Sequence, residues 1–168
     1  MLSYYHSTRK QIADSIAGLS TEQLNYKPGP DRWSVREVLE HLALTEPGIF
    51  GMAMAGLKTP VAAPESKLTD EQFIARVKDR SQKVEAPASF RPAGKWTSGE
   101  AVISEFKARR DQNLDSLRET QEDLTNTYFK SELGVMSVYQ TMLLVPAHNE
   151  RHLQQINEVK ASEGFPKR

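Results

Sequence analysis

Hydrophobic residues recur at helical spacings along most of the chain, whereas the sustained alternation that is typical of strands is scarce. At the beginning of the chain this spacing predicts an amphipathic helix whose polar face carries Arg9, Lys10 and Asp14. The helix should end near Gly18, and the later segment 24–32 is predicted to be a loop because it contains two prolines and a glycine. The apolar positions of its inner face are Leu2, Tyr5, Ile12, Ile16 and Leu19.

A second helix has a well-defined start. The Ser34 side chain is suited to accept a hydrogen bond from a free N–H group of the first turn, and Glu37 completes a capping box. Packing of Trp33 on Val38 would add a hydrophobic staple, so we expect the helix to begin at Val35. Its predicted buried stripe is Val35, Val38, Leu39 and Leu42.

The middle of the chain is predicted to be a long connection that contains one short helix. Pro47 and Gly48 should end the second helix, since neither residue favours a helix interior. Residues 51–64 are small and loosely patterned, and long connections of this kind often border functional sites. Thr69 and Gln72 repeat the capping-box spacing and predict a short extra helix.

Two more long helices follow. Trp96, Thr97 and Glu100 repeat the spacing seen at the start of the second helix, and they predict a helix capped by Thr97 that extends toward Leu124. The final helical pattern covers residues 137–160.

A proline interrupts this last helical pattern. Pro146 has no N–H group to donate to the carbonyl of Met142, so we expect a kink just before His148. The kink would be either a tolerated defect or a way of directing side chains. Taken together, these patterns predict one all-α domain over residues 1–168: a four-helix bundle with a short extra helix in a long connection.

Composition and charge exclude several classes of function. The chain has 22 Lys and Arg against 22 Asp and Glu, so it lacks the basic excess that binds nucleic acid through phosphates. No apolar run approaches the roughly 20 residues of a membrane span, and the first residues do not resemble a signal peptide. We therefore expect a soluble, cytoplasmic protein. With no cysteine, any metal must be bound by histidine and carboxylate groups.

Four histidines are present, and three of them have the spacing of a metal site. His148 and His152 are four residues apart on the last helix, so both imidazoles lie on one face. His41 lies at the edge of the buried stripe of the second helix and is the candidate third ligand. Three imidazoles would leave a coordination position open for water or substrate, as in catalytic sites.

Two other interpretations of these histidines have to be considered. The metalloprotease motif H-E-x-x-H does not fit, because Asn149 occupies the place of the general base and Glu150 is displaced by one residue. A histidine at the edge of an apolar stripe is also often a hydrogen-bonded structural residue. In that case the protein would be a helical scaffold without a metal.

The motifs on the second and last helices resemble those of the DinB-like superfamily, including its YfiT-type metal-dependent hydrolases. The two motifs are Trp33-Ser34-x-x-Glu37-x-x-x-His41-Leu42 and His148-x-x-x-His152-x-x-Gln155-Ile156. The resemblance implies an up-down-down-up bundle in which His41, His148 and His152 bind a divalent ion such as nickel or zinc. Characterised relatives include thiol-dependent transferases and isomerases that use bacillithiol or mycothiol.

The resemblance leads to expectations about function. We expect an enzyme that activates a low-molecular-weight thiol or water at the metal and acts on a small molecule. The resemblance also implies a homodimer. A YfiT-type hydrolase and a non-catalytic metal-binding module are the alternatives. Among the remaining polar residues, His6, Tyr4, Tyr139 and Asn149 are lesser candidates for the site, and Glu37 is explained by its capping role.

Overall fold

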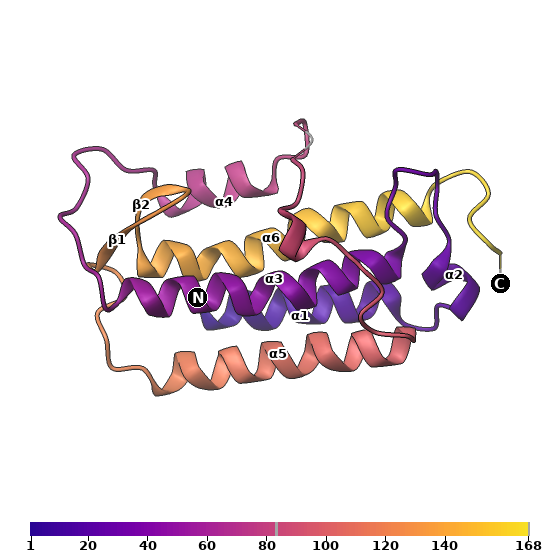
Figure 1. The fold of residues 1–168 in the computed structure, drawn as a ribbon, viewed down its shortest axis with the longest axis horizontal. Helices are drawn as coiled ribbons and strands as arrows, with labels where there is room; N and C mark the ends of the chain where they lie inside the picture. Colours follow the sequence, from indigo (N-terminus) through magenta and orange to yellow (C-terminus); the bar gives the residue numbers. More distant parts are fainter. Residues whose placement is uncertain (83, 168) are drawn as a thin grey trace.

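The computed structural model describes residues 1–82 and 84–167, and its four long helices form a bundle (Figure 1). These helices are α1 (Leu2–Ile16), α3 (Val35–Gly56), α5 (Gly99–Glu119) and α6 (Val138–Lys160). In Figure 1, α1 and α6 run in one direction and α3 and α5 in the other, which confirms the predicted up-down-down-up order. Within the described residues, no helix has the combination of length and hydropathy needed to cross a membrane.

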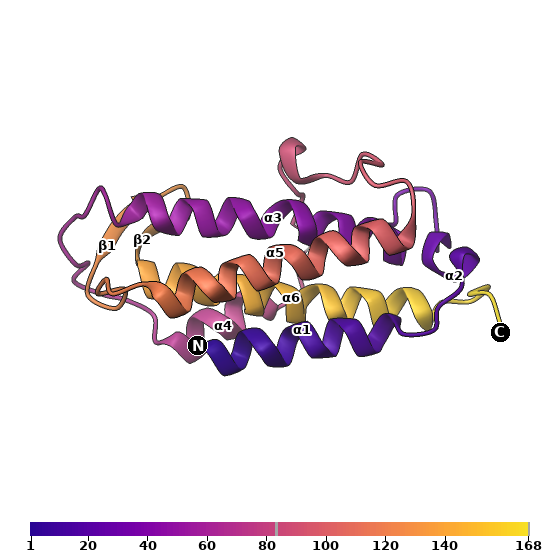
Figure 2. The same ribbon diagram turned by 90° about the horizontal axis from the view of Figure 1, so that it is seen from below.

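The four helices form a closed ring of contacts, which Figure 2 shows from a second side. Helix α3 packs against α5 and α6, and α1 packs against the same two helices from the opposite side. Since α3 and α5 are parallel, the chain between them must return along the whole bundle. This return contains the predicted short helix, α4 (Asp70–Lys78), which packs on α6, and a short 3-10 turn, η1 (Ala88–Phe90).

Most predicted helix starts are confirmed by their capping bonds. Ser34 and Glu37 form the expected reciprocal capping box at α3, and Thr69 does the same at α4. The start of α5 was predicted one residue too early: Ser98 rather than Thr97 is the N-cap, and its side chain accepts from the Ala101 N–H. Helix α5 also ends at Glu119, so Leu124 lies outside it.

The expected end of the second helix at Pro47 and Gly48 is wrong. Helix α3 continues through both residues to Gly56 because tertiary packing stabilises its second half. At Gly48 a Cβ atom would lie 2.8 Å from the Phe90 ring, and at Gly56 it would lie 2.4 Å from the Phe129 ring. The glycines therefore let neighbouring segments approach the helix closely.

A short helix and a two-stranded hairpin were not predicted from the hydrophobic pattern. Helix α2 (Thr21–Asn25) is a single short turn capped by Ser20, and β1 (Tyr128–Ser131) pairs antiparallel with β2 (Gly134–Ser137) in a small hairpin. The hairpin is too short for a sustained alternation to appear in the sequence. Its buried Phe129 covers the end of α3 at Gly56.

Helix α6 continues through Pro146 over the predicted range. The Met142 carbonyl, which loses its helical donor at Pro146, instead accepts a hydrogen bond from the Tyr5 hydroxyl at 2.7 Å. A side chain of α1 therefore satisfies the acceptor that the proline leaves free. The proline costs one helical hydrogen bond, and the contact joins α1 to α6 just before the segment that carries His148.

Candidate metal centre

Three histidines from two helices meet at the contact between α3 and α6. His41 is on α3, His148 and His152 are on α6, and their ligand atoms all lie within 4.8 Å of one another. The Nε2 atom of His148 is 3.3 Å from Nε2 of His41 and 3.0 Å from Nε2 of His152. The juxtaposition predicted from sequence spacing is thus present in the fold.

The opposite ring nitrogens of two of these histidines have their own hydrogen-bond partners. Nδ1 of His41 lies 2.7 Å from the carbonyl oxygen of Phe90, which only accepts, so this nitrogen carries the hydrogen. Nδ1 of His152 lies 2.8 Å from Oε1 of Gln155 and donates in the same way. In the neutral rings of His41 and His152, Nε2 is then a free electron-pair donor directed toward the cluster.

The spacing of the Nε2 atoms fits one shared transition metal ion. Two nitrogen ligands about 2.1 Å from an ion, at angles of about 90–109°, lie about 3.0–3.4 Å apart. The separations of Nε2 of His148 from Nε2 of His152 and of His41, 3.0 and 3.3 Å, fall in this range. Without an ion, the lone pairs of His41 and His152 face a third ring that offers at most one hydrogen between them. The donor set therefore fits a divalent ion better than it fits a purely structural network.

Burial keeps the three imidazoles in the neutral form that binds metals. His41 and His152 are 4% and 7% exposed, and burial lowers the pKa of both side chains. The pKa of His148 is lowered to about 3, first by desolvation and then by the neighbouring charge of His41 and Arg151. Neutral imidazole is the state that coordinates, so no proton has to be displaced near neutral pH.

Trp33 forms part of the wall of the cluster, although its position at a helix start indicated only a packing role. Its ring centroid is 4.9 Å from that of His41, and the ring is stacked on His152 at 6.4 Å. The indole shields this side of the cluster, while His148 keeps partial exposure. No periodicity could have identified the contact, since it depends on the path of the chain before α3.

The lesser candidates lie away from the three imidazoles. His6 is exposed, and its Nε2 lies 3.2 Å from the guanidinium of Arg118. Tyr4 donates to Glu150 at 2.9 Å, and Lys78 pairs with the same carboxylate at 2.6 Å. Burial and the contact with Glu150 raise the pKa of Tyr4 far above the physiological range, so its hydroxyl stays protonated. Tyr4, Glu150 and Lys78 thus connect α1, α6 and α4, and His6 contacts α5. None of them is part of the histidine cluster.

Tyr139 and Asn149 form no hydrogen bond with the three histidines among the described residues. Tyr139 is partly exposed, and burial raises the pKa of its hydroxyl. Asn149 follows His148 directly and is 2% exposed, and its side-chain nitrogen has no hydrogen-bond partner among the described residues. Its amide is therefore an unsatisfied donor on the residue next to His148 in the sequence.

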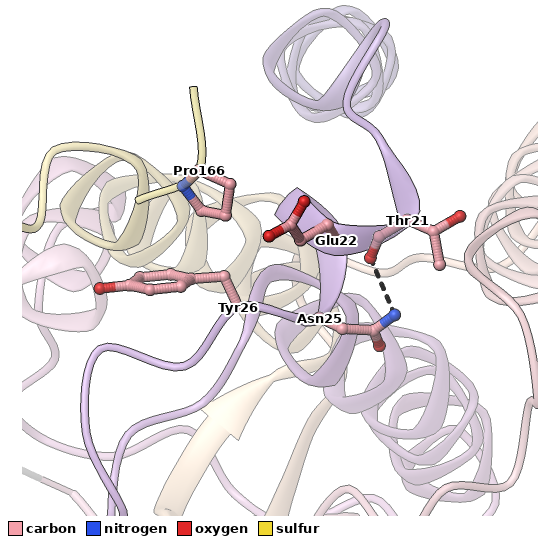
Figure 3. Close-up of a pocket in the computed structure, with 5 residues that line it drawn as sticks. All are labelled: Thr21, Glu22, Asn25, Tyr26 and Pro166. Atoms are coloured by element: carbon pink, nitrogen blue, oxygen red, sulfur yellow. Dashed lines mark hydrogen bonds between the residues drawn. The ribbon is translucent and has the colours of Figure 1, made fainter. Parts of the chain in front are cut away.

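A surface hollow at the α2 end of the bundle is separate from this cluster. Figure 3 shows it beside α2, lined by Thr21, Glu22, Asn25, Tyr26 and Pro166. The bond between the Asn25 amide and the Thr21 carbonyl is internal to α2, and Tyr26 donates to the Glu163 carbonyl at 2.6 Å. The Tyr26 contact attaches the C-terminal segment to the end of α2, and none of the three histidines lines the hollow.

The fold and the cluster together define a class of protein: an up-down-down-up helical bundle with three converging histidines between its second and last long helices. The sequence profile of the DinB superfamily matches residues 4–156, and the chain belongs to this superfamily. The resemblance found in the two histidine motifs is therefore confirmed at the level of the family.

Two further similarities agree with this assignment. The chain is 32% identical over 162 residues to the uncharacterized protein YuaE of Bacillus subtilis (strain 168), covering 95% of this chain and 96% of YuaE. Its fold is similar to that of YfiT from Bacillus subtilis, described as a probable metal-dependent hydrolase with an unusual four-helix bundle topology. That match has a TM-score of 0.63 at 15% identity and covers 95% of this chain and 83% of YfiT. At this identity the second similarity concerns the fold.

Proposed function

We propose that this protein is a metal-dependent enzyme in which His41, His148 and His152 hold one divalent transition metal ion, nickel or zinc. The observation that carries the proposal is that Nε2 of His148 lies 3.3 Å from Nε2 of His41 and 3.0 Å from Nε2 of His152, while Nδ1 of His41 and of His152 is already engaged. A divalent ion held there would lower the pKa of a bound water or thiol and polarise a substrate.

The surrounding residues have supporting roles. The Phe90 carbonyl and the Gln155 side chain hold two imidazoles in the orientation that presents Nε2, as outer hydrogen-bond partners do at histidine metal sites. Trp33 excludes water from one side, and the partial exposure of His148 leaves the approach for a small molecule. Three protein ligands leave room for one more, which is the arrangement of catalytic sites.

Two reactions are compatible with this site. In the first, a low-molecular-weight thiol provides the nucleophile, which suits a chain that has no cysteine of its own, and the protein acts as a thiol S-transferase. In the second, water is the nucleophile and the protein is a hydrolase. The description of YfiT as a probable metal-dependent hydrolase favours this second reaction.

The metal-binding part of the proposal is tested by metal analysis. The protein should be purified without a polyhistidine tag, because a metal found after nickel chromatography can come from the column. We expect about one nickel or zinc ion per chain in the wild type, and loss of the ion in His41→Ala. The matched control is His6→Ala, which removes an exposed histidine and should keep the ion. Equal metal content in all three proteins would contradict the proposed ligands.

The reaction is tested with two substrate panels. Metal-loaded protein is assayed with esters and amides, and separately with a small thiol together with an electrophilic acceptor. Turnover that is lost in His41→Ala and kept in His6→Ala assigns the reaction to the cluster. Stoichiometric metal without turnover in either panel would instead favour a non-catalytic metal-binding module. The expected cytoplasmic location and homodimer remain predictions.

A further inference from the structure

Residues 88–96, which comprise η1 and the chain that leads from it toward α5, lie along α3 beside the histidine cluster (Figures 1 and 2). We call them the 88–96 segment. Phe90, Pro92 and Trp96 are half-buried, and every other residue of the segment is exposed. With so little buried surface of its own, the segment depends on a few specific contacts for its position.

Helix α3 provides these contacts from four positions. Nδ1 of His41 donates to the Phe90 carbonyl at 2.7 Å, and the Phe90 ring lies over Gly48, where a side chain would collide with it. Arg36 donates to the Trp96 carbonyl at 3.0 Å. The fourth contact is made by Glu40, the residue next to His41 in sequence.

The Glu40 carboxylate holds the segment through three consecutive backbone N–H groups. Its Oε1 atom accepts from Ala93 at 3.0 Å and from Lys95 at 2.9 Å, and its Oε2 atom accepts from Gly94 at 3.3 Å. Glu40 is 1% exposed, and no Lys or Arg side chain of the described residues forms a salt bridge with it. The backbone of the segment is therefore the principal partner of a buried carboxylate.

The conformation of Gly94 makes this arrangement possible. Its φ angle is +75°, in the left-handed region, and such a residue turns successive N–H groups toward one point, which forms an anion-binding concavity. No atom lies within 4 Å of the position that a Cβ at Gly94 would take. A substitution there would act through the backbone conformation rather than through a steric clash.

We propose that Glu40 is a positioning residue for the metal site. By holding residues 93–95, it keeps the Phe90 carbonyl in front of Nδ1 of His41, and thereby keeps Nε2 of His41 free and directed at the ion. Glu40 does not itself approach the ion. The inference rests on the proposed function, since it concerns the metal affinity of the same three histidines.

The first test is Glu40→Gln. The glutamine amide keeps one oxygen, which can still accept from Ala93 and Lys95, but its NH2 group cannot accept from the Gly94 N–H and the negative charge is lost, so the hold of α3 on the segment should weaken. We expect the affinity for zinc, measured by competition with a chromophoric chelator, to fall about tenfold, as for other outer partners of metal-bound histidine. Glu105→Gln, which changes a half-buried pair with Arg109 on α5, is the control and should leave the affinity unchanged.

The second test leaves Glu40 intact and keeps the inference testable if Glu40→Gln does not fold. Gly94→Ala strains the concavity, and Gly134→Ala introduces the same change at a φ of +106° in the hairpin, also with open space around the added Cβ. We expect Gly94→Ala to weaken zinc binding about tenfold and Gly134→Ala to leave it unchanged.

A further readout separates positioning from general stabilisation. In 1H–15N spectra, the Nδ1 hydrogen of His41 should exchange faster with solvent in Glu40→Gln and Gly94→Ala than in the wild type. A purely structural role for Glu40 would lower the melting temperature of both variants, without changing zinc affinity per folded chain or this signal. That result would overturn the inference and leave the proposed function standing. Failure of the wild type to bind either zinc or nickel would overturn both.

Discussion

Two groups of polar side chains lie inside the bundle, and they differ in what is needed to complete them. The arginine cluster consists of Arg110, Glu46, Asn113, Thr8 and the Tyr5 carbonyl. The histidine cluster consists of His41, His148 and His152. Both join helices that are far apart in the sequence, yet only the first is satisfied by the protein's own atoms.

In the arginine cluster every charge and donor has a partner. Arg110 and Glu46 have fully buried side chains and form two parallel bonds of 2.6 and 3.0 Å. The remaining guanidinium nitrogen donates to the Tyr5 carbonyl and to Thr8, and Asn113 donates to Glu46. One positive charge meets one negative charge, so the cluster needs no additional ion.

In the histidine cluster the protein atoms leave nitrogen lone pairs with too few hydrogens to pair with. The described residues place no carboxylate among the three potential ligands, and two Nε2 atoms present lone pairs to a third ring. The comparison indicates how a structural polar cluster can be told from a binding site in a buried setting. In a structural cluster the protein's own donors satisfy its acceptors, whereas a cation site leaves lone pairs for which the protein supplies no donor.

The largest expected effect comes from breaking the arginine cluster. Glu46→Ala leaves the buried Arg110 charge without its partner and should lower the free energy of unfolding by about 3–5 kcal/mol, measured by urea denaturation. Asp111→Ala, which removes an exposed partner of Arg9, should cost less than about 1 kcal/mol. A Glu46→Leu and Arg110→Met double variant should recover much of the loss, and a double variant less stable than Glu46→Ala would contradict charge imbalance as the cause.

Adding a metal should affect only the histidine cluster. At a free zinc concentration of about 100 times the Kd, binding should stabilise the wild type by about 2.7 kcal/mol, or raise the melting temperature by about 5–10 °C. His152→Ala should show no such increase, and Glu46→Ala should keep it under conditions where the variant is folded. Stabilisation of His152→Ala by zinc to the same extent would place the metal elsewhere.

The two clusters should also differ in their response to pH in metal-free protein. The pKa of His148 is about 3 in the folded state, against about 6.5 in the unfolded chain. The unfolded chain therefore takes up the proton first. This contribution to stability is complete above about pH 6.5 and is lost as the pH falls toward 3, by up to about 1.4 kcal/mol per unit.

Urea denaturation between about pH 6.5 and 4.5 measures this slope above the range in which most carboxylates titrate. His148→Leu should have a smaller slope than the wild type, and the double variant of the arginine cluster should keep the slope of the wild type. Identical slopes in wild type and His148→Leu would show that His148 is not held neutral by burial.

The smallest effect is expected from removing a histidine in the absence of metal. At about pH 8, His148→Leu should change the free energy of unfolding of metal-free protein by less than about 1 kcal/mol, since it removes at most one hydrogen bond, from Nε2 to one of the two facing lone pairs, and puts an apolar side chain in its place. Chemical denaturation in the presence of a chelator measures this value. A loss as large as that of Glu46→Ala would mean that the histidine cluster is structural.

The helices and the three histidines could be predicted because their signals are local. Ser34 and Glu37 mark the start of α3 within four residues, and the spacing of His148 and His152 places both on one face of a helix. The addition of His41 required only that the apolar face of α3 be turned inward. Local periodicity, together with the resemblance of the two motifs to the DinB-like superfamily, therefore sufficed to indicate the three candidate ligands.

The remaining features depend on contacts between distant segments. The continuation of α3 past Pro47 depends on Phe90 and Phe129 packing over its glycines, and these residues carry no periodic signal. Likewise, Trp33 and the Phe90 carbonyl reach the histidines through loops whose paths no local pattern determines. The outer part of the site therefore required the structure, although its centre did not.

X-ray absorption at the zinc edge of the zinc-loaded protein tests the shared cation most directly. We predict three imidazole nitrogens at about 2.0–2.1 Å in the wild type and two in His41→Ala if that variant retains zinc. His6→Ala should give the spectrum of the wild type. A spectrum dominated by oxygen ligands, or one that His41→Ala leaves unchanged, would contradict the convergence of the three histidines on one ion.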